Sequence, residues 1–287
     1  MGDNATASTV AAARSRGEAA LQDLLWVSSD GAGGGGYYKA YLYNDESALM
    51  ADALYGAVIA LGVGLGSLAP PSQMSLHLAA EMSHNYDPFG FVTITNRTKP
   101  PPDGQHPDDT KLWGQAGPDW SSLTLQLATA TAALSDPKEG GGGINVTAAL
   151  DPAFRQLDNW RTRLASLWNL AGITSAEDKA NPDLSALPFC TAHYGFDLVA
   201  FWLMPALSGQ LLDLPGETLT FNPVLPCPYQ LPFMGAALEG TLGCDAGGVF
   251  TLTLAFGTLQ LPAGGLSVSG KAYANTVSLG PGDALSW

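Results

Sequence analysis

Acidic side chains stand at the head of the most apolar stretch of the sequence. Asp45 and Asp52 lead into the apolar run 53–69. Because 44-NDES-47 combines capping residues with acids of a first turn, we expect a helix over residues 47–62, with Asp52 about one turn inside it. A carboxylate in this position can complement the helix dipole, or it can act as a proton donor in catalysis. The pattern leaves both interpretations open.

Aromatic side chains accompany these acids. Tyr37, Tyr38 and Tyr43 closely precede Asp45, and a second loop that is both acidic and aromatic follows at 108-DDTKLWGQAGPDW-120. Aromatic faces stack on the apolar faces of a pyranose ring, and a pair of carboxyl groups cleaves a glycosidic bond as acid/base and nucleophile. The combination favours a carbohydrate site. The alternative is that these aromatic residues are ordinary, partly buried anchors.

Other chemistries lack their motifs. The sequence contains no Gly-x-Ser-x-Gly elbow, Walker loop, dinucleotide fingerprint or HExxH. His77 and His84 share a predicted helix face, but no third ligand accompanies them. The cysteines Cys190, Cys227 and Cys244 are widely spaced and odd in number, so they make neither a metal cage nor an even disulfide framework. We therefore expect no metal and no cofactor.

The chain changes its periodicity near residue 205. Before that point apolar residues recur at helical spacing, and after it they alternate with polar residues in short runs. This pattern predicts a mainly α chain with a C-terminal β region (α+β). Residues 1–205 would form the helical domain, and residues 206–287 an antiparallel β region that is too short for its own sandwich and packs on the helices. The expected helices are 8–26, 47–62, 72–86, 119–135, 151–171 and 193–209, and the expected strands are 217–223, 249–261, 265–270 and 275–280.

Charge and hydropathy exclude some partners. The formal net charge of −14 repels phosphate backbones, so nucleic acid is not an expected partner and a neutral ligand is favoured. The most apolar window, residues 53–69, contains four glycines in 17 residues and is not expected to span a membrane. The N-terminus lacks the apolar core of a secretory signal. These features favour a cytoplasmic or peripheral-membrane location.

Two stretches read together resemble a known family. The stretch 24-LLWVSSDGAGGGGYYKAYLYND-45, followed by 50-MADALYGAVIALGVGLG-66, is similar to family 116 glycoside hydrolases, the non-lysosomal glucosylceramidases and their bacterial β-glucosidase relatives. In that family a helix ends on Leu-Trp-Asn-Gly and a Tyr-Tyr-x-Tyr-Asp loop follows. Met-Ser-Asp then opens a helix that closes on Gly-Leu-Gly. The matching residues here are Trp26, Tyr37, Tyr38, Tyr43, Asp45, Met50, Ala51, Asp52, Gly56, Gly64, Leu65 and Gly66.

The resemblance carries expectations about fold, site and partners. It implies half of an (α/α)6 barrel, the C-terminal half, followed by the small antiparallel β segment. It assigns the general acid/base to Asp52. The substrate would be a β-glucoside or glucosylceramide, with peripheral membrane association through a lipid substrate. The residues expected to bind the sugar are Tyr38, Tyr43, Asp45, Asp109 and Trp113.

The sequence departs from the family in three places. The family's nucleophile is a Glu more than a hundred residues before the acid/base, whereas 51 residues precede Asp52 here. We therefore expect the nucleophile, and the N-terminal half of the catalytic domain, to lie outside this chain, which would be a truncated fragment. Ala51 replaces the family's Ser, and Lys111 stands where a sugar-binding Glu precedes the Trp by two. The alternative function is a non-catalytic carbohydrate-binding or structural module, in which Asp52 only complements a helix dipole.

Overall fold

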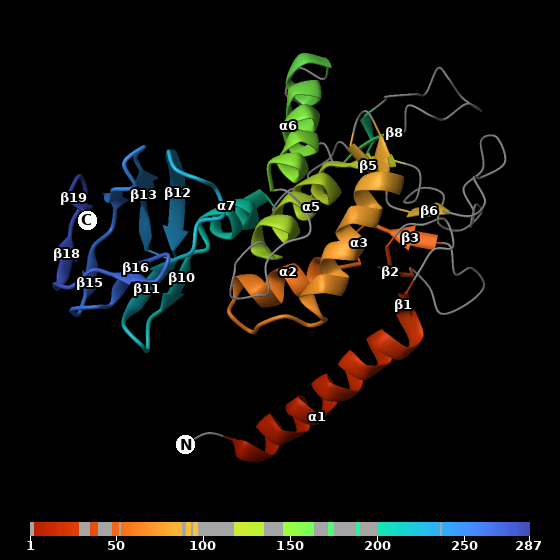
Figure 1. The fold of residues 1–287 in the computed structure, drawn as a ribbon, viewed down its shortest axis with the longest axis horizontal. Coiled ribbons are helices and arrows are strands. Elements are labelled where there is room, and N and C mark those ends of the chain that lie inside the picture. The colour runs from red at the N-terminus through yellow and green to blue at the C-terminus, as the bar shows by residue number, and fades with distance from the viewer. Residues whose placement is uncertain are drawn as a thin grey trace.

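A computed structural model gives the structure of the chain. It describes residues 3–28, 35–39, 48–51, 53–87, 90–92, 94–96, 118–134, 146–163, 172–174, 188–189, 200–235 and 237–287. Helices and short strands alternate through the first two thirds of the chain, and strands alone make up the last third (Figure 1).

The helices follow the predicted pattern in type and differ from it at their ends. The helix expected from residue 47 begins only at Tyr55, and residues 48–50 are a strand. A second helix begins at Val146, so that Pro152 lies inside it rather than at its first turn. The helices are α1 (Asn4–Ala20), continued by the π-helical turn η1 (Leu21–Leu25), α2 (Tyr55–Gly62), α3 (Pro71–His84), α5 (Ser121–Leu134), α6 (Val146–Arg163) and α7 (Ala200–Ser208).

Helix α5 is the centre of the helical part, and α1 lies outside it. α5 contacts α2, α3, α6 and α7. One buried cluster, which includes Leu54, Met74, Leu78 and Phe91, joins α2, α3, α5 and α6 to the strands beside them. By contrast, α1 buries no residue along its length and projects from the body (Figure 1).

Short strands lie between these helices. One antiparallel sheet has the order β4-β5-β7-β8-β9, and two smaller pairings are β1-β2 and β3-β6. The strands are β1 (Trp26–Val27), β2 (Tyr37–Tyr38), β3 (Ala48–Met50), β4 (Tyr86–Asp87), β5 (Gly90–Val92), β6 (Ile94–Asn96), β7 (Pro118–Trp120), β8 (Gly172–Thr174) and β9 (Pro188–Phe189).

The expectation of a mainly α fold built on half of an (α/α)6 barrel is therefore wrong. The described chain is a mixed α+β fold, because strands β1–β9 lie among the helices instead of following them. The reason is local composition. Short runs that contain aromatic and β-branched residues, such as Phe91, Trp120 and Ile173, fit a pleated sheet and pair with one another.

The last third of the chain is a pair of four-stranded sheets. Their orders are β10-β11-β16-β17 and β12-β13-β14-β19, and β15-β18 forms a separate pair. The two four-stranded sheets share one buried cluster, in which the Phe221 and Phe233 rings meet edge to face at 5.5 Å. The strands are β10 (Leu211–Asp213), β11 (Thr218–Phe221), β12 (Tyr229–Gly235), β13 (Leu238–Cys244), β14 (Phe250–Phe256), β15 (Leu259–Leu261), β16 (Leu266–Val268), β17 (Lys271–Ala272), β18 (Val277–Leu279) and β19 (Ala284–Ser286).

This β region differs from the expectation in three ways. It has its own two-sheet core, although it was expected to be too short for one. The pairing of β11 with β16 is parallel, whereas the other pairings of the region are antiparallel. A disulfide joins Cys227 to Cys244, with Cα atoms 5.4 Å apart, so two of the three cysteines pair after all.

Helix α7 joins the β region to the helices. Pro205, where the periodicity changes, lies inside α7. Leu203 and Leu207 of this helix pack with residues of α5 and α6 on one side and with Leu231 of β12 on the other. None of the helices in the described ranges is long and apolar enough to cross a membrane.

Candidate functional site

The structure joins three segments of the resemblance motif in one short ladder. Trp26 of β1 lies opposite Tyr38 of β2 in an antiparallel pair. The next residue, Lys39, forms an antiparallel bridge with Leu49 of β3. Leu49 and Ala51 are completely buried. Residues 26–27, 37–39 and 48–51 therefore form one connected unit that ends one residue before Asp52.

Tyr38 is the centre of this unit. Its ring lies 4.9 Å from the Trp26 ring and 5.7 Å from the His77 ring, measured between centroids, and its side chain is 2% exposed. Gln22 Nε2 donates a hydrogen bond of 2.9 Å to the Tyr38 hydroxyl, which itself donates to Gln73 Oε1 at 2.9 Å. Burial raises the pKa of Tyr38, and the bond from Gln22 lowers it in part. At neutral pH Tyr38 is a neutral phenol with both of its hydrogen-bonding roles filled.

A row of polar side chains on α3 holds this unit in place. Gln73, His77, Glu81 and Asn85 follow one another at four-residue spacing and so lie along one side of the helix. The backbone N–H of Tyr38 donates to His77 Nδ1 at 3.1 Å, and Asn85 Nδ2 donates to the carbonyl of Leu49 at 3.3 Å. The α3 row, as we call these four residues, thereby fixes both β2 and β3.

His77 and Glu81 are a buried pair within the α3 row. Both side chains are at most 1% exposed, and His77 Nε2 lies 2.9 Å from Glu81 Oε1. Because Nδ1 accepts the Tyr38 N–H, the imidazole carries its proton on Nε2 and presents it toward the carboxylate. The pair is closed to solvent. Its contact with the site is the bond from the Tyr38 N–H to His77, which positions β2.

Of the residues predicted to form the site, Tyr38 is the one that the structure describes. Asp52, Tyr43, Asp45, Asp109 and Trp113 lie outside the described residues, as does Lys111. The predictions for these residues stay predictions.

Sequence reasoning missed the α3 row. A signal for it was present, since four polar residues at four-residue spacing interrupt a helix whose other positions include Met74 and Leu78. We considered His77 only as a partner of His84, but His77 is buried and His84 is exposed. Within the described ranges no group of three or more His, Cys, Asp or Glu side chains could hold a metal ion.

Comparison with models of known protein families and with curated proteins finds no match for this chain. The resemblance to family 116 therefore depends on the residues of the motif and on their spacing.

Proposed function

We propose that this chain supplies the acid/base and aromatic part of a carbohydrate site of the kind found in retaining β-glucosidases and glucosylceramidases. One observation carries the proposal. Trp26, Tyr38 and Met50, which match the family motif from three separate segments, lie in β1, β2 and β3, and these strands are linked by the β1–β2 pairing and by the bridge between Lys39 and Leu49. Matching residues from three segments are therefore brought to neighbouring strands.

The proposed chemistry centres on Asp52. Its carboxyl would protonate the glycosidic oxygen of a β-glucoside, and the carboxylate would then activate water. This requires a pKa near neutral, which burial and a partner carboxylate at about 5 Å provide in retaining enzymes. Tyr43, Asp45, Asp109 and Trp113 are proposed to hold the sugar.

Tyr38 has a different part in this proposal. Its hydroxyl is bonded to Gln22 and Gln73, and its side chain is buried. We therefore propose that Tyr38 positions β2 and does not contact the sugar directly.

The proposed substrate is neutral. A glucoside carries no charge, which suits a chain with a net charge of −14. A lipid-linked glucoside such as glucosylceramide would bring the chain to a membrane surface peripherally. Nucleic acid is not proposed as a partner.

An assay with an added nucleophile tests the role of Asp52. Because the resemblance places the nucleophile outside these 287 residues, azide is added to supply it. Azide attacks C1 of the glucoside, the C1–O bond breaks, and Asp52 gives its proton to the leaving oxygen. The products are an α-glucosyl azide and the free alcohol, measured by mass spectrometry and NMR.

Two aglycones separate proton donation from other roles of Asp52. With an alkyl β-glucoside, whose leaving oxygen needs a proton, Asp52→Asn should abolish azide-dependent cleavage. With a 2,4-dinitrophenyl β-glucoside, whose leaving group needs none, the variant should retain it. Asp23→Asn, which removes an equal charge from an exposed position in η1, is the matched control and should behave as the unmodified chain.

Other outcomes contradict the proposal in distinct ways. Equal cleavage by the unmodified chain and by Asp52→Asn with both aglycones would remove Asp52 from the reaction. Failure to cleave either glucoside would favour the non-catalytic module, a carbohydrate-binding one if glucose still binds and a structural one if it does not. Cleavage without azide that depends on Asp52 would place the nucleophile within this chain.

A further inference from the structure

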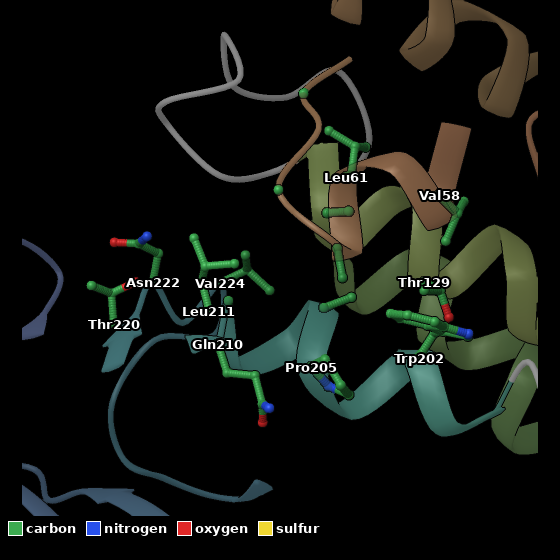
Figure 2. A pocket seen from close by; sticks show the side chains of 16 residues that line it. Val58, Leu61, Thr129, Trp202, Pro205, Gln210, Leu211, Thr220, Asn222 and Val224 are labelled. Atoms are coloured by element: carbon green, nitrogen blue, oxygen red, sulfur yellow. The ribbon is translucent and has the colours of Figure 1, made fainter. Parts of the chain in front are cut away.

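A partly open cavity of about 260 Å³ lies between the helical part and the β region (Figure 2). Val58 and Leu61 of α2 line one wall, and Trp202 and Pro205 of α7 line another. Leu211 of β10 and Val224, which follows β11, close the third side. This volume is slightly below the usual range for drug-sized ligands, so the cavity suits a smaller molecule.

The chemistry of the lining selects a neutral, apolar ligand. None of the described residues that line the cavity is charged, although the chain as a whole carries a net charge of −14. An ionic group that lost its water inside the cavity would find no charged partner among these residues to compensate for the loss. The ligand therefore has no ionic group inside the cavity.

The polar side chains of the lining are too few and too occupied for a sugar. The Gln210 amide donates to the carbonyl of Met234 at 2.5 Å and accepts from the Met234 N–H at 3.2 Å, and in Figure 2 its side chain extends away from the other labelled residues. Thr129 is buried, with 1% of its surface exposed. The other described polar side chains are Trp202, whose indole carries a single N–H, and Thr220 and Asn222, which lie together at one end (Figure 2). A ligand with one polar end and an aliphatic remainder fits this distribution better than a sugar with hydroxyls on every side.

The apolar surface continues outside the cavity. Gly64 and Gly66 line it, and their neighbours Val63 and Leu65 are 49% and 64% exposed. Leu211, in the lining itself, is 43% exposed. Exposed aliphatic side chains around an apolar cavity extend the surface on which an alkyl chain can lie.

We propose that this cavity is a binding site for a neutral aliphatic ligand, whose alkyl chain packs against Leu61, Trp202 and Leu211. The polar end of the ligand lies toward Thr220 and Asn222. None of the residues proposed for the carbohydrate site is among the described residues that line the cavity. The inference does not depend on the proposed function.

Titration of the full chain with 1-octanol tests the proposal. Octanol should bind saturably at one site, measured by calorimetry and by displacement of the neutral fluorophore N-phenyl-1-naphthylamine. Octanoate, which has nearly the same chain but a negative charge, should bind at least ten-fold more weakly. Asp52→Asn should leave octanol binding unchanged, which separates this test from the test of the carbohydrate site.

Two variants locate the ligand. Ala133→Phe places a large ring in the cavity, and Leu211→Asn replaces an aliphatic wall at an exposed position where the fold tolerates it. Each should weaken octanol binding at least ten-fold. Leu214→Asn makes the same substitution at a residue that is 71% exposed and outside the lining, so it should leave binding unchanged.

The proposal is overturned by any of three results. One is the absence of saturable octanol binding by the folded chain. Another is binding that Leu211→Asn and Leu214→Asn affect equally. The third is octanoate binding as tightly as octanol, which would show that the ligand is recognised by charge.

Discussion

Three polar side chains, on α3 and at its C-cap, make specific contacts with described residues in and beside the resemblance motif. Gln73 and His77 bind the hydroxyl and the backbone N–H of Tyr38, and Asn85 binds the carbonyl of Leu49. Buried polar groups cost free energy unless they are paired, so such a row specifies one register of β2 and β3 against α3. At the scale of single residues, buried polar groups of α3 and its C-cap hold β2 and β3 in place.

Tyr38→Phe tests the hydroxyl at the centre of this network. The change keeps the ring but removes two hydrogen bonds, so it should lower the free energy of unfolding by roughly 1–3 kcal/mol. The loss can be measured by urea denaturation at pH 7, with retained packing checked by near-ultraviolet circular dichroism.

The same variant has a predictable pH dependence. Because burial raises the pKa of Tyr38 in the folded chain, its stabilising contribution is full below the pKa of an unfolded tyrosine, about 10. That contribution is lost as the pH rises through the higher folded value. Tyr38→Phe should therefore show a shallower fall in stability above pH 10 than the unmodified chain. Some fall should remain, since burial also raises the pKa of Tyr229. An unchanged alkaline profile would contradict the assignment to Tyr38.

Gly257 is a second residue for which the structure predicts the effect of a substitution on stability. Its φ is +83°, and a Cβ there would collide with the carbonyl oxygen of Ala237. Gly248 has φ +81° with no atom within 4 Å of such a Cβ, so it is a matched control. Gly248→Ala should cost roughly 1–2 kcal/mol for the left-handed backbone alone. Gly257→Ala should cost clearly more in the same urea titration, and equal losses would show that the turn can shift.

At the scale of elements, helices were easier to predict than strands. Each of the six helical patterns overlaps a helix of the structure, because apolar residues recur at helical spacing over more than two turns. The hairpin β12–β13 was missed. Its strands, 229-YQLPFMG-235 and 238-LEGTLGC-244, carry Pro232, Gly240 and Gly243, which read as turn residues. Pairing across seven residues and burial of Leu231, Phe233 and Leu242 override that local signal.

The disulfide next to this hairpin has a measurable effect. Cys227 and Cys244 close a loop with a sequence separation of 17, and such a crosslink typically stabilises a domain by about 3 kcal/mol. Cys227→Ser combined with Cys244→Ser should lose about that amount in denaturation without reductant. Peptide mapping without reductant should recover the 227–244 crosslink, and its absence in the oxidised chain would contradict the pairing.

At the scale of the whole molecule, the largest error was the expectation of half of an (α/α)6 barrel. The motif that carries the resemblance spans residues 24–66, and a local motif does not determine how later helices pack. The pairing of β4, β5, β7, β8 and β9 joins segments up to about a hundred residues apart. Such pairings depend on contacts that no short window of sequence contains.

The β region after residue 205 has a buried core of its own. That core draws its buried residues from Leu219 to Leu279, all within the β region. A fragment of residues 209–287 should therefore fold by itself and unfold cooperatively, measured by circular dichroism and NMR. Leu252→Ala, at a fully buried position, should destabilise the fragment and the full chain by similar amounts, about 2–5 kcal/mol. A fragment without a cooperative transition would show that the β region needs the packing of α7 against it in order to fold.

Helix α1 can open locally while the rest of the molecule stays folded. Its 17 residues make a helix about 26 Å long. In the part of the chain that the structure describes, its side-chain hydrogen bonds to the other elements come from Arg14, which donates to the carbonyls of Leu65 and Ser67. A helix with so little tertiary contact opens locally at a small cost in free energy, so its amide protons should exchange with deuterium far sooner than those of α5. Brief digestion with trypsin should cut first after Arg16 and release the N-terminal segment, while both cores and the thermal transition of the remaining chain are preserved.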